Sequence, residues 1–219
     1  MHFHGSFPAE LKRLVSPADL NANKGASYRE KRKKTDETTN NTGMEKLKLD
    51  ELNRVSIEEF KEQEKLPLVV VLDNVRSMHN IGSIFRTGDG FAITQLCLCG
   101  ITAQPPHREI EKTALGATQS VDWKHYESTL EAVKALREEG YLIIAVEQAS
   151  GSTMLNTFKP QQDQKYALIF GNEVNGVSDE VMEVIDECIE IPQFGTKHSF
   201  NIVISAGIVL WDFFAKLRL

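Results

Sequence analysis

The segment NIGSIFRTGDG, residues 80–90, places one arginine, Arg86, between two glycines that lie four residues before and after it. Glycine inside a helix costs about 1 kcal/mol relative to alanine, so the two glycines need a reason. If the segment is helical, Gly82, Arg86 and Gly90 share one face, and the arginine is left uncovered there. Asn80 is suited to cap such a helix. The spacing indicates a cationic group that is open to a ligand, and an arginine in a surface ion pair is the alternative.

A second polar segment, FGNEVNGVS at residues 170–178, follows an apolar stretch. Its glycine and asparagine residues predict a tight backbone loop that presents amide groups and one carboxylate, Glu173. The lysine and Ser/Thr of a phosphate-binding P-loop are absent from the segment, and no G-x-G-x-x-G occurs in the chain. An ordinary turn between a strand and a helix is the alternative.

A third segment, residues 189–214, reads IEIPQFGTKHSFNIVISAGIVLWDFF and ends in an almost wholly apolar helix. We expect this helix to be buried on all sides. Its first turn carries Ser199 and Asn201. An N-cap would by itself explain Ser199, whereas a buried Asn201 amide must find hydrogen-bond partners. With the amide groups of the helix start, the two side chains would form a small polar pocket.

The elements that must position these residues alternate between short apolar stretches and amphipathic ones. The predicted strands are residues 68–72, 95–98, 141–146, 166–170 and 188–191. The predicted helices between them include residues 128–139, which Gly140 ends, and residues 178–187, which Ser178 caps. This alternation predicts an α/β fold, a parallel sheet flanked by helices on both faces. Ligands bind beyond the carboxyl ends of the strands in such a sheet, and all three polar segments follow strands.

The chain is long enough for one domain of this kind and an appendage. Residues 1–43 are polar, show no helical or strand period, and are expected to form a disordered basic extension. Residues 44–66 predict one or two short helices, with a capping box from Ser56 to Glu59, and residues 67–219 form the main domain. The extension carries a net charge of +3 and the whole chain −6, which leaves −9 on the rest. An acidic body with a basic tail fits a nucleic-acid binder, and a solvated chain end is the alternative.

Cysteine usage and hydropathy argue against several classes of protein. Cys97 and Cys99 alternate in QLCLC, so strand geometry points them to one face, and Cys188 makes the number of thiols odd. We expect buried, reduced cysteines, and no metal site, because the histidines show no paired spacing with them. The chain shows no secretory leader and no apolar run of the roughly 20 residues that a membrane helix needs. We therefore expect a cytoplasmic protein that does not span a membrane.

Taken together, NIGSIFRTGDG, IFGNEVNGVS and IEIPQFGTKHSFNIVISAGI resemble, in this order, the three sequence motifs of the SpoU/TrmH family of RNA 2′-O-methyltransferases in the SPOUT superfamily. With the intervening EKTALGA, the resemblance covers about residues 67–217. It implies a homodimeric SPOUT-type fold whose C-terminal part forms a trefoil knot that holds S-adenosyl-L-methionine. It also implies an activity, the methylation of a ribose 2′-hydroxyl in tRNA or rRNA.

The resemblance carries the family's catalytic positions onto five residues of this chain. Asn80 and Arg86 match the polar pair of the first motif, and Glu173 matches the acid of the second. Ser199 and Asn201 match the polar residues of the third. We expect Asn80 and Ser199 to orient the arginine or the ribose, and Glu173 to orient the arginine or answer the sulfonium charge of the cofactor.

Four positions are implied to bind the cofactor. Gly171, Ile191 and Phe200 match positions that contact it, largely through the backbone, and Asn201 is expected to order the cofactor loop. Phe200 departs from the family, which usually has leucine there. An aromatic ring at this position either crowds the adenine side or stacks on it, so it bears on cofactor affinity.

The chemistry suggests a role for Arg86. Methyl transfer from a sulfonium needs little activation of the electrophile, whereas a ribose hydroxyl must lose its proton, so the site has to stabilise an oxyanion and align the reacting atoms. In the family the matching arginine is thought to activate this hydroxyl. A guanidinium has a pKa above 12 and no acceptor, so we expect Arg86 to bind the forming oxyanion or the neighbouring phosphate while the proton passes to water or phosphate. Gly82 and Gly90 would keep space for the ribose.

The rest of the chain is acidic, yet it is expected to bind RNA, so we expect a local basic surface. Its predicted members are Arg76, Arg86, Arg108, Lys112 and Lys197, aided by the basic run at residues 31–34. One alternative is a non-catalytic knotted protein that binds cofactor or RNA during RNA maturation. A flavodoxin-like nucleotide-binding domain is another, but it lacks a phosphate loop and leaves Asn201 unexplained.

Overall fold

The computed structural model describes residues 46–52 and 54–219. By its internal contacts the chain divides into two units, and the larger one is Asn53–Leu217. The described part of the smaller unit at the N-terminal side contains one 3-10 helix, η1 (Leu49–Leu52). The predicted disordered extension, residues 1–43, lies outside the described residues.

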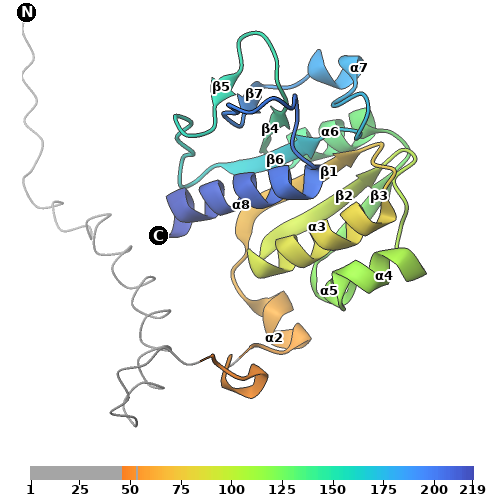
Figure 1. Ribbon diagram of the computed structural model, residues 1–219, viewed down its shortest axis with the longest axis vertical. Helices are drawn as coiled ribbons and strands as arrows, with labels where there is room; N and C mark the ends of the chain where they lie inside the picture. The colour runs from red at the N-terminus through yellow and green to blue at the C-terminus, as the bar shows by residue number, and fades with distance from the viewer. Residues whose placement is uncertain (1–45, 53) are drawn as a thin grey trace, which may run out of the picture. The chain divides into compact units, whose positions relative to one another are not determined.

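A sheet of seven parallel strands forms the centre of the larger unit (Figure 1). The strands are β1 (Leu66–Asp73), β2 (Ile93–Cys99), β3 (Trp123–Tyr126), β4 (Tyr141–Val146), β5 (Thr153–Met154), β6 (Lys165–Phe170) and β7 (Glu187–Glu190). Their order across the sheet is β3-β2-β1-β6-β4-β7-β5. The chain therefore builds outward from β1 to β3 and then returns to build the other half of the sheet.

Helices cover both faces of the sheet, as Figure 1 shows. They are α2 (Ile57–Glu62), α3 (Met78–Gly90), α4 (Arg108–Ala114), α5 (Ala117–Ser120), α6 (Thr129–Glu138), α7 (Asp179–Met182) and α8 (Ile202–Arg218). Core residues of α3, α4, α5 and α8 pack in one apolar cluster, and core residues of α6 and α7 pack in another. These two clusters lie on opposite faces, because alternate β1 residues belong to each. The predicted parallel sheet flanked by helices is confirmed.

The strand β1 shows why its sequence forms the centre of this sheet. Its run of β-branched and leucine residues suits a strand that is buried on both faces. Val69 and Val71 pack on the α6 side, together with Cys97 and Cys99 of the neighbouring β2. The prediction that both thiols share one face is confirmed, and burial raises the pKa of Cys97 to about 12.

The predicted elements are recovered with two corrections. The five predicted strands all exist, and α6 begins after its cap Ser128 and ends before Gly140, whose φ is +84°. The predicted helix 178–187 is wrong, because α7 ends at Met182 and the chain enters β7 at Glu187. The sequence analysis also missed the short strands β3 and β5, since neither has a long apolar run.

The second correction concerns α8, which was expected to be buried on all sides. Ala206, Val209 and Phe213 are fully buried, but the side chains of Ile204 and Trp211 are 52% and 53% exposed. One face of the helix packs on the sheet, and the other is an apolar face that no described residue covers fully. No described helix is both long enough and apolar enough to span a membrane.

Residues 54–66 lead into the sheet. Ser56 and Glu59 form the predicted capping box at the start of α2, with the Ser56 backbone N–H donating to Glu59 Oε2 at 2.8 Å. The helix α2 ends at Glu62, and β1 begins at Leu66, with Pro67 as its second residue.

Candidate active site

A pocket of about 830 Å³ opens beyond the carboxyl ends of β4, β6 and β7. Three segments line most of it: residues 146–149 at the end of β4, residues 170–177 at the end of β6, and residues from Ile191 to Ser205 after β7. Glu173 and Ser199 are among the lining residues, as are all four predicted cofactor residues, Gly171, Ile191, Phe200 and Asn201. The structure thus brings six predicted site residues of the second and third segments together around one pocket.

The loop of residues 171–178, called here the pocket loop, has a shape that its sequence dictates. The backbones of Asn172 and Gly176 donate to each other's carbonyl, each at 2.9 Å. Asn172 Oδ1 accepts from the backbone N–H of Val174 at 2.9 Å, which closes the turn inside this bridge. A Cβ at Gly171 would overlap the backbone of Gly176 and Val177, so the close approach of the two loop ends requires glycine there.

Glu173 holds the start of α3, and its two predicted roles, orienting Arg86 or answering the sulfonium charge, stay predictions. Its Oε2 accepts from the backbone N–H of Arg76, and its Oε1 from that of Ser77, each at 3.1 Å. Oε1 also accepts from Asn80 Nδ2 at 3.0 Å. Burial alone would raise the pKa of Glu173, but these hydrogen bonds outweigh it and lower the pKa. The carboxylate therefore links the pocket loop to the helix that carries Arg86.

The helix α3 begins differently from the prediction. Its cap is Ser77, whose hydroxyl accepts from the backbone N–H of Asn80 at 3.3 Å, so Asn80 lies inside the first turn. The Asn80 side chain is thereby free to donate to Glu173.

Arg86 lies on the exposed surface of α3 and does not line the pocket. The structure gives it no ion pair or hydrogen bond with any described residue, so the surface ion pair that was its alternative is not formed within that part of the chain.

The explanation for the two glycines around Arg86 is also corrected. Gly82 is buried, and a Cβ there would overlap Ile110 O and Thr113 Oγ1, so this glycine lets α3 approach α4 closely. A Cβ at Gly90 would meet nothing within 4 Å. The first glycine serves helix packing, and the second has open space around it.

At the start of α8 the N-cap contact is made by Asn201 and not by Ser199. Asn201 is exposed, and its Oδ1 accepts from the backbone N–H of Val203 at 2.8 Å, which is the contact of an N-cap. Ser199 lies two residues further from the helix and is also exposed. The buried amide expected at Asn201 is therefore wrong: the residue is exposed and lines the pocket.

Two carboxylates that the sequence analysis did not single out hold the far end of the pocket loop. Glu147 Oε2 accepts from the backbone N–H of Val177 at 3.2 Å, and Asp73 Oδ2 accepts from that of Ser178 at 2.8 Å. Each acid stands at the end of an apolar strand, β4 or β1. An acid at the carboxyl end of a buried strand was the signal that could have found them.

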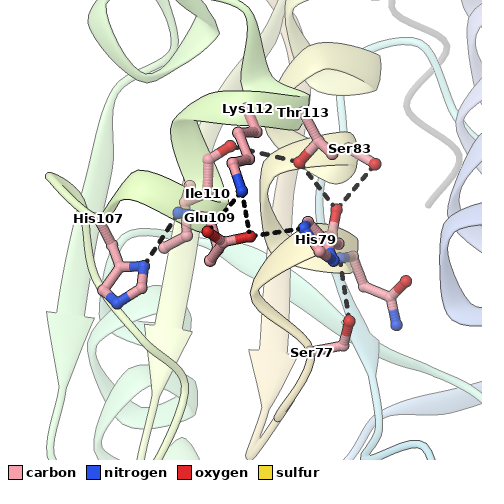
Figure 2. Close-up of polar contacts among 9 residues, drawn as sticks. Ser77, His79, Ser83, His107, Glu109, Ile110, Lys112 and Thr113 are labelled. Carbon is pink, nitrogen blue, oxygen red and sulfur yellow. Dashed lines mark hydrogen bonds and ion pairs between the residues drawn. The ribbon is translucent and has the colours of Figure 1, made fainter.

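Beside α3, the helix α4 contributes a second polar cluster, which Figure 2 shows. His79 Nε2 lies 3.0 Å from Glu109 Oε2, and Lys112 Nζ donates to Glu109 Oε1 at 2.7 Å. The hydrogen bond from Lys112 lowers the pKa of Glu109. All five predicted basic-surface residues, Arg76, Arg86, Arg108, Lys112 and Lys197, are exposed. Lys112 is the one of them that an acidic side chain already engages within the described part of the chain.

The charge of the pocket has one sign. Its lining includes the acids Glu147, Glu173 and Asp179 and one histidine, His198, and it includes no lysine or arginine. Such a site favours a cationic or neutral ligand and disfavours a phosphate. Within residues 46–52 and 54–219, no group of three or more His, Cys, Asp or Glu side chains could hold a metal ion.

Among known proteins, the chain is similar to RNA methyltransferases. It is 28% identical over 159 residues to the 23S rRNA (guanosine-2′-O-)-methyltransferase RlmB of Neisseria meningitidis, covering 72% of this chain and 62% of that protein. Its fold is similar to that of the AdoMet-bound rRNA methyltransferase of Sinorhizobium meliloti, with a TM-score of 0.65, 28% identity, and coverage of 75% and 62% of the two chains. The TrmH/SpoU tRNA modifying enzyme of A. aeolicus matches with a TM-score of 0.64, 25% identity, and coverage of 73% and 79%.

The RlmB protein of Vibrio parahaemolyticus is 25% identical over 162 residues, which are 74% of this chain and 64% of that protein. The chain thus spans less than two thirds of the length of these curated relatives. Residues 67–211 match the model of the SpoU rRNA Methylase family, and this range includes the three polar segments almost entirely. By this match and the shared fold, the chain belongs to the SpoU rRNA methylase family.

Proposed function

We propose that this protein is an S-adenosyl-L-methionine-dependent methyltransferase that methylates a ribose 2′-hydroxyl in tRNA or rRNA. The observation that carries the proposal is the connection made by Glu173. This residue lines the pocket, and its carboxylate holds the backbone and the Asn80 amide at the start of α3, which also carries Arg86. A cofactor pocket and a cationic group on a neighbouring helix are thereby kept in one fixed arrangement.

The lining of the pocket fits the proposed cofactor. A sulfonium is a cation, and the carboxylates of Glu147, Glu173 and Asp179 give the pocket the opposite sign. Gly171, Ile191 and Phe200 also line its wall, and Phe200 is 42% exposed. When bound there, the cofactor supplies an electrophilic methyl carbon. A flavin phosphate has no cationic partner among these residues, which disfavours the flavodoxin-like alternative.

We assign to Arg86 the role of binding the nucleophile, the ribose 2′-hydroxyl. A guanidinium is a hydrogen-bond donor without an acceptor, so it does not remove the proton of the hydroxyl, which passes to water or phosphate. It stabilises the oxyanion that forms at O2′, or it binds the adjacent phosphate and so aligns the ribose. No described side chain competes for it, so the substrate is free to engage all of its donors. Asn80, fixed by Glu173, supports the start of the same helix.

The partners follow from the surface. The exposed basic residues of α3 and α4 and of the segment before α8 are placed to contact RNA phosphates. The uncovered apolar face of α8, with Ile204 and Trp211 half exposed, supports a homodimer, because such a face is stable in water when a partner covers it. We also infer a cytoplasmic location, where tRNA and rRNA are found. The trefoil knot implied by the family resemblance stays a prediction, as do the domain boundaries at residues 43 and 66.

The test is methyl transfer from labelled S-adenosyl-L-methionine to total RNA, followed by digestion to nucleosides. We expect a ribose-methylated nucleoside with the wild type and a loss of at least about 100-fold with Arg86→Ala, which should still bind the cofactor. Arg137→Ala is the matched control, because it removes an arginine that pairs with Asp186 on the α6 side of the sheet. If Arg86→Ala keeps near-wild-type turnover, the role of the arginine is wrong. Cofactor binding without any labelled RNA would favour the non-catalytic alternative.

A further inference from the structure

Asp73 is a buried carboxylate that none of the three sequence motifs contains. It is the last residue of β1, and it is 1% exposed. Its oxygens accept three hydrogen bonds: Oδ1 from Thr129 Oγ1 at 2.6 Å and from Asn74 Nδ2 at 2.8 Å, and Oδ2 from the backbone N–H of Ser178 at 2.8 Å. Burying a carboxylate is costly unless it is fully hydrogen-bonded. We therefore expect the Asp73 carboxylate to hold its three donors in a required arrangement.

The donors show what that geometry is. Ser178 ends the pocket loop, and Thr129 is the first residue of α6. Asp73 therefore joins the loop to the helix α6. Through Asn74 it also reaches the beginning of the loop. Asn74 has a φ of +54°, and its carbonyl accepts from Asn172 Nδ2 at 2.7 Å.

Both ends of the pocket loop are therefore set from β1. Asn172 closes the turn within the loop, and the next residue, Glu173, reaches α3. A shift of Asp73 would move the pocket wall and the start of the Arg86 helix together, because hydrogen bonds through Asn74 and Asn172, and the peptide bond from Asn172 to Glu173, connect the two.

We propose that Asp73 is a positioning residue for methyl transfer, which shapes the cofactor pocket by fixing both ends of the pocket loop. The proposal rests on the proposed function, since it assumes that the pocket takes S-adenosyl-L-methionine. Asp73 does not line the pocket, so it acts through Asn74 and Ser178 and contacts neither the cofactor nor the RNA.

Replacing Asp73 by asparagine isolates this role with a minimal change in shape. If the new amide nitrogen takes the place of Oδ2, the backbone N–H of Ser178 loses its acceptor. If it takes the place of Oδ1, Asn74 Nδ2 loses its acceptor instead. One end of the loop is released in either case, and an unpaired buried donor is costly.

The experiment measures the Kd of S-adenosyl-L-methionine by calorimetry for the full chain, at a temperature where every variant is folded, together with kcat and KM. Asp186→Asn is the matched control: Asp186 Oδ2 also accepts a backbone N–H, from Ile143 at 2.8 Å, but it does not touch the pocket loop. We expect Asp73→Asn to raise the Kd about tenfold and to raise KM for the cofactor. Asp186→Asn should lower the thermal midpoint and leave the Kd within about twofold of wild type.

A second variant keeps the proposal testable if Asp73→Asn does not fold. Asn172→Asp keeps the acceptor for Val174 but replaces the Nδ2 donor by an oxygen that faces the carbonyl of Asn74. It therefore removes the hydrogen bond that joins the beginning of the pocket loop to Asn74. It should raise the Kd in the same direction. Unchanged cofactor affinity in the folded variants would overturn the positioning role. A wild-type protein that binds no S-adenosyl-L-methionine would instead refute the proposed function, and the inference would fall with it.

Discussion

Glu173→Gln tests the link between the pocket and α3 most directly. The carboxylate accepts two backbone N–H groups and one side-chain amide at 3.0–3.1 Å. Hydrogen bonds to a charged group contribute about 1.5–3 kcal/mol each when buried, but Glu173 is an exposed residue, so solvent screening reduces each to about 1 kcal/mol. A glutamine amide can satisfy the donors of one oxygen only, and its own NH₂ then faces the remaining donor. We estimate a cost of about 2 kcal/mol for holding the start of α3.

If that arrangement is needed in the transition state, turnover should fall about 30-fold. The assay is labelled methyl transfer with separate kcat and KM values, and Glu180→Gln is the control, because it makes the same charge change at an exposed position outside the pocket lining. Wild-type turnover in Glu173→Gln, with unchanged unfolding, would refute the reasoning.

The acid dependence of the same variant gives an independent check. The folded-state pKa of Glu173 is lowered, so its contribution to stability is present above the unfolded pKa of about 4.3 and is lost as the pH falls through the lower folded value. The difference in unfolding free energy between wild type and Glu173→Gln should therefore be constant near neutral pH and shrink below about pH 4. A difference that vanishes between pH 6 and 7 would contradict this account.

The other predictions concern packing, reactivity and RNA binding. Gly82→Ala should destabilise the protein by about 1–3 kcal/mol in thermal or urea unfolding, because its Cβ overlaps α4, whereas Gly90→Ala, in open space, should be neutral or stabilise by up to about 1 kcal/mol; equal effects would contradict the packing role. The Cys97 thiol, whose pKa burial raises to about 12, should resist alkylation at pH 8 in the native protein and react in urea, as peptide mass spectrometry would show. Deleting residues 1–43 should weaken RNA binding and flatten its salt dependence, and an unchanged salt slope would show that the basic tail makes no phosphate contacts.

The sequence predicted well the features that depend on local patterns. Runs such as LVVVL in β1 and the Ser128 and Gly140 boundaries of α6 follow from burial and capping alone. The helix expected at 178–187 failed because Val184 and Ile185, which fit a helical stripe, lie in the connection to β7. The prediction for Asn201 failed for a related reason: the apolar residues around it predicted burial, but it lies just before α8 and is exposed.

The functional contacts that the sequence analysis missed all join segments that are far apart along the chain. Asp73 to Ser178, Glu173 to Ser77 and Gly82 to Ile110 each depend on which strands are neighbours and on how closely helices approach. Motif spacing could indicate that Glu173 belongs to the site, but it could not indicate that its donors lie at the start of α3. The order β2-β1-β6-β4-β7 sets those neighbours, because it places β1 beside β6 and brings the two loops to one edge of the sheet. The pocket loop is therefore the element through which a change in β1 is expected to reach both the cofactor and Arg86, and substitutions there should alter binding and turnover together.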